Sequence, residues 1–304
     1  MLSIAPNLPR NLRVLDLCTG VGCIPLPFQH QLSRRRPDTL LRMVGVDISP
    51  DALQLARDNT ERVLRDAREE YNVLPPQTQA LEQIKYIPAD VLGKSPDHPT
   101  LEAALVLKPA LNPGESRVTK GLRAYTAKTF HILICNHPYI SPSDFLRTTS
   151  RSVREFEPEL ALVPPPNSAI SHEEEGDVFY PRLLEIAHQA KAIMVLFEVA
   201  DLSQALRVAR IARRLGKELA HEHARMEVPF PDRVGWDEIQ IWRDEPGKVG
   251  AIEESQTIDG FEVIGRGNGR SVFYSKHHVR DWFSSSDKLR LREQIIELST
   301  QGTS

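Results

Sequence analysis

The residues best equipped for chemistry lie in the stretch FHILICNHPYIS, from Phe130 to Ser141. An apolar run of the kind that forms a buried strand ends there in an amide, an imidazole, a proline ring and a phenol, supplied by Asn136, His137, Pro138 and Tyr139. In an open α/β sheet the ligand crevice lies outside the carboxyl ends of the strands. A buried strand with these groups at its end therefore indicates a ligand site.

A second candidate site follows the first apolar run, in LDLCTGVGCI. Asp16 ends the run, and Thr19, Gly20 and Gly22 belong to a short turn that opens a helix. Glycines let backbone amides approach a ligand closely, so this turn favours a nucleotide-like ligand. The alternative left open by the pattern is a tight strand-to-helix turn with no ligand.

Acidic residues also end the next two apolar runs. Asp47 is placed where a carboxylate can accept both hydroxyls of a ribose, although an acid there could equally stabilise the following helix start. Asp90, with Val91 after it, is placed where an adenine could be held by its edge and its face; the alternative is a loop residue without that role.

The residues of the first turn indicate which nucleotide-like ligand is bound. It reads C-T-G-V-G-C from Cys18 and lacks the full G-x-G-x-x-G of dinucleotide-binding proteins. A dinucleotide needs the helix amino terminus free for its pyrophosphate, whereas S-adenosylmethionine carries positive charge that an acid attracts. Because Asp16 stands just before the turn, the sequence favours S-adenosylmethionine.

The elements that position these residues alternate between short β-rich runs and helical stretches. This pattern predicts an α/β fold with a doubly wound, mostly parallel sheet covered by helices. We expect strands at residues 12–17, 43–48, 84–89, 131–136 and 192–199, and helices at about 23–35, 49–70, 178–191 and 201–216. Ser49 should cap the second helix, and Gly216 should end the last one.

Beyond residue 216 the alternation changes. Residues 236–244 and 261–275 are typical of strands added antiparallel at a sheet edge, and the tail at 276–304 contains an amphipathic helix. We therefore assign residues 1–275 to one catalytic domain, with an insertion at about 91–129 and a connection at about 245–260.

Composition excludes several kinds of protein. A formal net charge of -3 gives no reason to expect non-specific attraction to nucleic acid, so direct nucleic-acid binding is not predicted. No apolar run approaches the roughly 20 residues that span a bilayer. The 3 cysteines are too few and too unevenly spaced for a disulfide framework or a zinc site, so we predict no metal centre and an intracellular location.

With these strand ends followed by ICNHPYIS, the sequence resembles class I S-adenosylmethionine-dependent methyltransferases, and more closely the HemK-type family that methylates a glutamine amide in translation release factors. The family's G-T-G-T-G turn is matched by residues 18–22, and its N-P-P-Y motif by residues 136–139. VREFEPELAL (153–162) and GDVFYPRLLEIA (176–187) also look like family segments. The resemblance spans about residues 12–275 and implies a seven-stranded Rossmann-like sheet.

The resemblance also implies roles for the site residues. The cofactor would be held by Asp16, Cys18, Thr19, Gly20, Gly22, Asp47, Asp90, Val91 and Asn136. The Asn136 side-chain oxygen and the His137 backbone carbonyl would accept the two N–H groups of the substrate amide, more strongly as positive charge develops. Tyr139, after Pro138, would wall the pocket, and the proton can leave to water without a general base.

The sequence departs from the family pattern at three places. His137 stands where a proline is usual and keeps the carbonyl but not the stiffening ring; its imidazole either titrates near neutral pH or packs facing solvent. Cys18 replaces the first glycine of the turn, where a positive φ would have an energetic cost. About a dozen residues precede the first strand, so the family's helical amino-terminal domain is expected to be absent.

The leading hypothesis is therefore N5-methylation of a protein glutamine, with the GGQ motif of a peptide-chain release factor as the expected target and partner. One alternative is an N6-adenine methyltransferase acting on DNA or RNA, and another is a non-catalytic binding protein with the same fold. The resemblance favours the mitochondrion over the cytoplasm, although no transit peptide is evident in the sequence.

Overall fold

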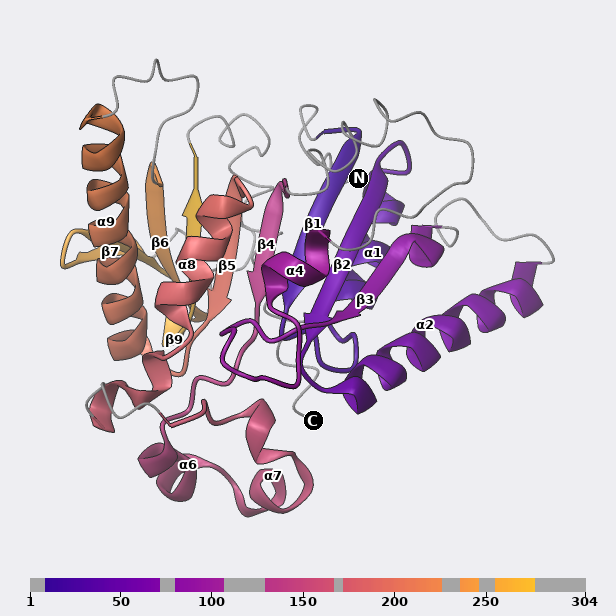
Figure 1. Cartoon of the computed structure of the whole chain (residues 1–304), viewed down its shortest axis with the longest axis horizontal. Coiled ribbons are helices and arrows are strands. Elements are labelled where there is room, and N and C mark those ends of the chain that lie inside the picture. The colour runs from indigo at the N-terminus through magenta and orange to yellow at the C-terminus, as the bar shows by residue number, and fades with distance from the viewer. Residues whose placement is uncertain are drawn as a thin grey trace.

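The computed structural model describes residues 9–71, 80–106, 129–166, 172–225, 236–245 and 255–276. Its strands are β1 (Asn11–Leu17), β2 (Leu40–Asp47), β3 (Ile84–Pro88), β4 (Ile132–Cys135), β5 (Met194–Glu198), β6 (Glu238–Glu245), β7 (Ser255–Ile258), β8 (Phe261–Ile264) and β9 (Arg266–Ser275). They form one 9-stranded sheet in the order β3-β2-β1-β4-β5-β9-β6-β8-β7 (Figure 1).

The direction of the strands confirms the predicted fold class. Strands β3, β2, β1, β4 and β5 are parallel, whereas β9 runs antiparallel between β5 and β6. The chain proceeds from β1 outward to β3, and then returns to the other side of β1 to build β4 and β5. The carboxyl ends of β1 and β4 thus flank a topological switch point, where open α/β sheets bind their ligands.

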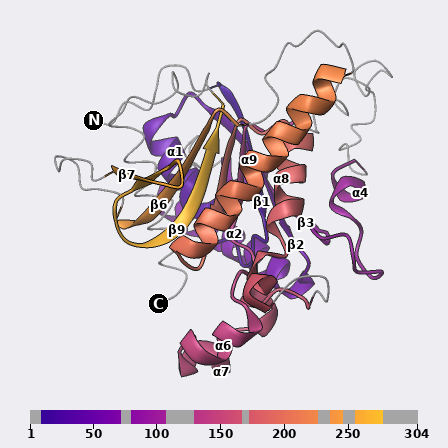
Figure 2. The ribbon, with the colours of Figure 1, turned by 90° about the vertical axis from the view of Figure 1, so that its left-hand side faces the viewer.

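Helices cover both faces of the sheet. They are α1 (Pro25–Arg35), α2 (Pro50–Tyr71), α4 (Leu101–Val106), α6 (Pro142–Thr148), α7 (Arg151–Phe156), α8 (Tyr180–Gln189) and α9 (Leu202–Arg225), with short 3-10 turns η1 (Ala80–Gln83), η2 (Glu159–Ala161) and η3 (His172–Asp177). In Figure 2, α8 and α9 lie together on one side of the sheet and α1 lies on the other. The predicted cap of α2 is confirmed, because Ser49 Oγ accepts from the Ala52 N–H at 3.2 Å.

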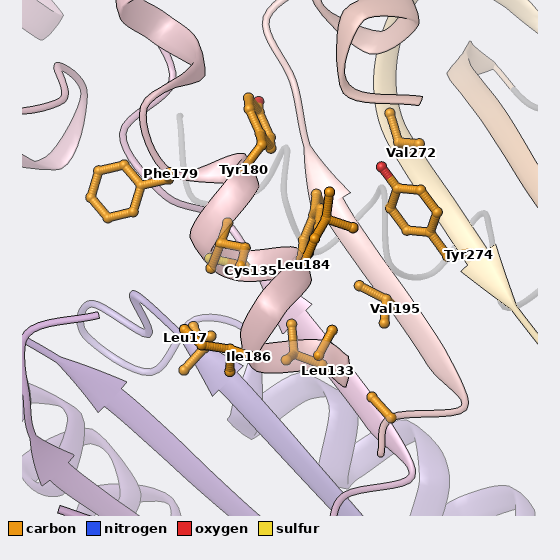
Figure 3. Close-up of a cluster of buried hydrophobic side chains, with 14 of the residues drawn as sticks. Leu17, Leu133, Cys135, Phe179, Tyr180, Leu184, Ile186, Val195, Val272 and Tyr274 are labelled. Atoms are coloured by element: carbon orange, nitrogen blue, oxygen red, sulfur yellow. The ribbon is translucent and has the colours of Figure 1, made fainter. Parts of the chain in front are cut away.

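Two buried clusters sit on opposite faces of the same strands, because successive side chains of a strand alternate. Leu17, Leu133 and Val195 pack with α8 residues such as Tyr180 and Leu184 (Figure 3). The alternate residues of β1 and β4 pack with Phe28 and Leu32 of α1. The central strands are therefore almost fully buried, which explains why their sequences are continuous apolar runs.

Two expectations about the carboxyl-terminal part are wrong. The sheet has 9 strands instead of seven, because Gly265 turns the chain with φ 91 and divides residues 261–275 into β8 and β9, while β7 occupies part of the expected connection. Gly216 does not end α9, which continues to Arg225. Leu215, Gly216 and Leu219 line a small hollow against α8 and Trp236, and this packing outweighs the roughly 1 kcal/mol cost of a helical glycine.

The first part of the predicted insertion belongs to the core. Val91 and Leu101 are 4% and 2% exposed, and α4 packs in the same cluster as α8. Residues 107–128 and the predicted tail helix lie outside the described residues. None of the helices in the described part of the chain combines the length and apolar character that a membrane crossing requires.

Candidate active site

The candidate residues lie at one edge of the sheet. In the register of the strands, Leu17 pairs with Val46 and with Cys135, and Cys135 pairs with Phe197. The residues that follow these positions therefore emerge side by side at the carboxyl edge. This edge holds the turn after β1, Asp47 at the end of β2, Asn136 after β4 and Glu198 at the end of β5.

The turn after β1 has a left-handed backbone at three of its residues. Cys18, Gly20 and Gly22 have φ values of 57, 55 and 86. A Cβ on Gly22 would lie 2.9 Å from the hydroxyl of Tyr86, so only glycine fits there without a shift. Cys18 is not a glycine and adopts the positive φ at a cost of about 1–2 kcal/mol. The strain expected at Cys18 is therefore present.

Asp16 is the most deeply buried acid of this edge, with 0% exposure. Its Oδ2 accepts from the Thr19 hydroxyl at 2.5 Å, while its Oδ1 is buried without a hydrogen-bond partner. Burial raises the pKa of Asp16 to about 7; the Thr19 hydrogen bond lowers it and the charge of Asp47 raises it. A buried carboxylate oxygen with no partner is unfavourable, so this atom fits a cationic or hydrogen-bonding ligand group.

Asp47 connects the first turn to the start of α2. Its Oδ2 accepts from the Gly20 N–H at 2.8 Å, and its Oδ1 accepts from the Ser49 N–H at 2.9 Å. Asp47 thus serves the local structure, as the simpler reading of the sequence expected. Because each carboxylate oxygen has two lone pairs, each oxygen keeps one acceptor position for a ribose hydroxyl.

Asp90 is engaged mainly by its own loop. Its Oδ1 accepts from Leu92 N–H at 2.8 Å, and its Oδ2 accepts from Lys94 and Ser95 N–H at 2.7 and 2.8 Å. Burial tends to raise the pKa of Asp90, but these backbone hydrogen bonds outweigh it and the pKa is lowered. The carboxylate is therefore ionised and engaged by backbone N–H groups of its own loop, and Val91 beside it is buried.

Asn136 differs from these acids. Its side chain is partly exposed and has no hydrogen-bond partner among the described residues. It follows β4, a strand that is buried along its whole length. A rigid strand therefore presents, at the switch point of the sheet, an amide that no described residue engages, so that both its oxygen and its NH₂ group can meet a ligand.

Both sequence readings of the His137 side chain are wrong. The imidazole is 1% exposed and packs edge-on against Tyr180 with ring centroids 4.4 Å apart, and at 5.2 Å from Phe179. Both ring nitrogens are buried without a partner. Burial lowers the pKa of His137 to about 3, so the ring neither faces solvent nor titrates near neutral pH. Aromatic packing holds this position, where the family usually has a proline.

Tyr139 is held at both of its ends, and Pro138 before it is buried. The Tyr139 hydroxyl donates to Glu198 Oε1 at 2.9 Å, and the Tyr139 backbone carbonyl accepts from Gln204 Nε2 at 3.1 Å. Burial and the Glu198 charge raise the pKa of Tyr139 above its usual range, so the phenol remains protonated.

Sequence reasoning missed Glu198 and Gln204. Glu198 ends β5 as Asp47 ends β2, so the same signal, an acid that closes an apolar run, could have identified it. Burial raises the pKa of Glu198 to about 7, although the Tyr139 hydrogen bond and Arg270 lower it. Gln204 lies in the first turn of α9, and no local sequence signal distinguishes it. In the described residues no group of three or more His, Cys, Asp or Glu is placed to hold a metal ion.

The residues of this edge fit S-adenosylmethionine. The unpartnered Oδ1 of Asp16 lies beside a turn with two glycines, as a positively charged ligand that approaches the backbone would require. Asp47 keeps acceptor positions for hydroxyls, whereas the Asp90 carboxylate is already engaged by backbone N–H groups of its own loop.

Comparisons with known proteins confirm the resemblance to release factor glutamine methyltransferases. The chain is 33% identical over 152 residues to the probable MRF1 mitochondrial N(5)-glutamine methyltransferase mtq1 of Schizosaccharomyces pombe, covering 50% of this chain and 36% of that protein. It is 26% identical over 156 residues to the release factor glutamine methyltransferase of Koribacter versatilis, covering 51% and 37%. The chain thus spans little more than a third of the length of these curated relatives.

A shorter match concerns a ribosomal substrate. The ribosomal protein uL3 glutamine methyltransferase of Xanthomonas campestris is 46% identical over 54 residues, which is 18% of this chain and 16% of that protein.

Among solved structures, the hMettl16 catalytic domain in complex with MAT2A 3'UTR hairpin 1 aligns over 87% of this chain and 63% of its own, with 13% identity and a TM-score of 0.41. No family model matches the chain.

Proposed function

We propose that this chain, about half of which is homologous to glutamine methyltransferases, transfers a methyl group from S-adenosylmethionine to the N5 atom of a protein glutamine. The expected target is the GGQ motif of a peptide-chain release factor, a protein partner. The observation that carries the proposal is the amide of Asn136, which no described residue engages and which a buried strand holds next to the acid-lined turn after β1.

The turn after β1 and the next two strand ends would hold the cofactor. S-adenosylmethionine, when bound, supplies an electrophilic methyl group. Asp16 offers its unpartnered oxygen to positive charge, and Thr19, through its hydrogen bond to Asp16, orients that carboxylate. The backbone at Cys18, Gly20 and Gly22 allows close approach. Asp47 would accept from hydroxyls, and Asp90 and Val91 would bind the edge and face of an adenine.

The loop after β4 would hold the substrate amide. A primary amide is a poor nucleophile because its nitrogen lone pair is delocalised, so the nitrogen must be oriented and the charge it acquires must be stabilised. The Asn136 side-chain oxygen and the His137 backbone carbonyl are the two acceptors for its N–H groups. The ring of Tyr139 would pack on the amide plane, and the proton would leave to water.

The burial of His137 supports this division of roles. Burial lowers the pKa of His137 to about 3, so the imidazole is neutral at the pH of a cell. It is therefore too weak a base to take up the proton that the amide loses. Its packing between Phe179 and Tyr180 fixes the backbone, and with it the carbonyl that the amide needs. The family's proline ring is thus replaced by aromatic packing.

One transfer assay tests the proposal. The protein is incubated with labelled S-adenosylmethionine and either a release factor, its GGQ-to-GGA variant, ribosomal protein uL3 or an adenine-bearing oligonucleotide. Label on the wild-type factor but not on the GGA variant supports the proposal. Label on uL3 or on the oligonucleotide would redirect it to another substrate, and cofactor binding without any transfer would favour the non-catalytic alternative.

The mitochondrion is the site of action that we propose, on the strength of the name of the S. pombe relative. Methylation of a mitochondrial release factor in cells, lost when the gene is deleted and restored by this chain, would support it. Methylation of a cytosolic factor alone would contradict it.

A further inference from the structure

Glu198 lies next to the substrate loop although it belongs to another strand. Cys135 pairs with Phe197, so the residue after each of them, Asn136 and Glu198, emerges at neighbouring positions of the sheet edge. Tyr180 also holds the backbone of Glu198, because the Tyr180 hydroxyl donates to the Glu198 carbonyl at 2.9 Å. The same Tyr180 packs on His137 at 4.4 Å. A single α8 residue therefore fixes both Glu198 and the backbone of the substrate loop.

The backbone end of Tyr139 is already fixed by other groups. Gln204, 3% exposed, donates to the Tyr139 carbonyl and also to Asp177 Oδ1 at 2.9 Å. Arg207 pairs with the same Asp177 through two nitrogens. Gly176 completes this contact, since a Cβ there would lie 2.5 Å from the Tyr139 oxygen. These contacts fix the main chain of Tyr139, while its ring packs edge-on to His137 with centroids 6.1 Å apart.

Glu198 Oε1 restricts the orientation of this ring further, through its 2.9 Å hydrogen bond with the Tyr139 hydroxyl. A buried carboxylate that accepts a hydrogen bond has a free-energy cost, because burial disfavours its charged form. Burial raises the pKa of Glu198 to about 7, so near neutral pH part of the population carries the charge that strengthens the bond. Arg270, on β9, is the cation that lowers this pKa and favours the charged form.

We propose that Glu198 is a positioning residue for methyl transfer: it fixes the ring of Tyr139 so that the ring forms one wall of the substrate-amide pocket beside Asn136. This role presupposes the proposed glutamine methyltransferase activity. It adds a residue from β5 to a site so far built from the carboxyl ends of β1, β2, β3 and β4. Glu198 itself does not need to touch the substrate.

The test compares Glu198→Ala, Glu198→Gln and Tyr139→Phe with the control Glu218→Ala, which removes an exposed acid of α9. For Glu198→Ala and Tyr139→Phe we expect kcat to fall about tenfold, with KM for the release factor within about twofold, because orientation acts on the transition state. The double variant should be no slower than either single one. Glu198→Gln, whose amide oxygen can still accept, should recover most of kcat.

The outcomes separate this role from the function on which it depends. If the wild type transfers methyl groups and Glu198→Ala keeps its kcat, or if Glu198→Gln is as slow as Glu198→Ala, the positioning role is overturned. A fall in melting temperature without a fall in kcat would likewise leave Glu198 with a merely structural role. If the wild type transfers nothing to any glutamine acceptor, the proposed function fails and this role fails with it.

Discussion

The acids at the ends of β1, β2 and β3 and the amide after β4 share one sheet edge. They differ in whether the described residues provide hydrogen-bond partners for their side chains. Asp16, Asp47 and Asp90 each accept at least one hydrogen bond from the protein itself. Asn136 accepts none from the described residues. The acids hold their loops in shape before any ligand is present, whereas the amide is kept available.

This difference matches what the proposed function requires of each half of the site. A cofactor pocket that is preformed avoids the cost of ordering loops when the ligand binds. A group that stabilises charge developing on a substrate must instead have a free acceptor at the moment of reaction. The two regions should therefore respond differently to substitution.

The largest effect is expected for Asn136→Ala. Loss of a fixed acceptor for the reacting amide should lower the transfer rate at least about 100-fold. Cofactor affinity should change by less than about tenfold, or roughly 1.4 kcal/mol. Transfer to a release factor and cofactor Kd, measured on one preparation, check this. Equal activity of the variant and the wild type would sink the role assigned to Asn136.

Asp16→Asn should lower cofactor affinity, whereas Asn136→Ala should lower the transfer rate. Loss of a charge-assisted contact should weaken the cofactor about tenfold at pH 8. Because burial raises the pKa of Asp16 to about 7, the wild-type affinity should fall by up to tenfold per pH unit below pH 7, as the carboxyl becomes protonated. Calorimetry from pH 6 to pH 8 tests this. A pH dependence that persists in the variant would point to another group.

The stability of Asp16→Asn provides an internal control. A folded pKa of about 7, above the unfolded 3.8, means that the folded state binds more protons between these values. Wild-type stability should therefore fall as pH rises through this window. The variant lacks this loss, so at pH 8 it should melt at a higher temperature than the wild type even though it binds the cofactor less well.

A smaller effect is expected for Gly22→Ala, which tests the close contact in the turn after β1. Gly22 has φ 86, and its Cβ would lie 2.9 Å from the Tyr86 hydroxyl. Strain and overpacking should destabilise the fold by about 1–3 kcal/mol. Gly93→Ala is a matched control with φ 65 but no neighbour nearer than 3.6 Å. If thermal melts show equal losses for both variants, the close contact at Gly22 is not what matters.

The smallest effect concerns His137→Leu. Burial lowers the pKa of His137 to about 3, below its unfolded value, so the unfolded state binds more protons between pH 3 and 6.5. The wild type should lose stability as pH falls through that window, by up to about 1.4 kcal/mol per unit. The variant should lose less. Chemical denaturation at pH 7 and pH 5 measures the free energy of unfolding of both proteins. An equal loss between the two pH values in the wild type and the variant would contradict the buried, neutral imidazole.

Much of the site could be predicted because its signals are local. The apolar runs that become β1, β2 and β4 end in Asp16, Asp47 and Asn136, and parallel pairing brings these ends together without further information. The same argument could have included Glu198. Ser49 was predictable as a helix cap for a similar reason, since its role depends on residues a few positions away.

The rest depends on partners far along the chain. His137 is buried because α8 brings Phe179 and Tyr180 onto it, and nothing near His137 in the sequence indicates that contact. The N–H groups that engage Asp90 come from the backbone of its loop, whose conformation the residue types alone do not specify. Gly216 stays helical because of packing on α8, which overrides its local preference.

The most direct test of the proposed function is whether the side-chain amide of Asn136 meets the substrate glutamine. Protein labelled with ¹⁵N-asparagine, saturated with S-adenosylhomocysteine, is titrated with a release factor and separately with its GGA variant; the Asn136 side-chain signal is assigned by its loss in Asn136→Ala. We predict that the GGQ factor shifts this signal and that the GGA variant does not. A signal unchanged by a GGQ factor that is bound and methylated would contradict the central claim.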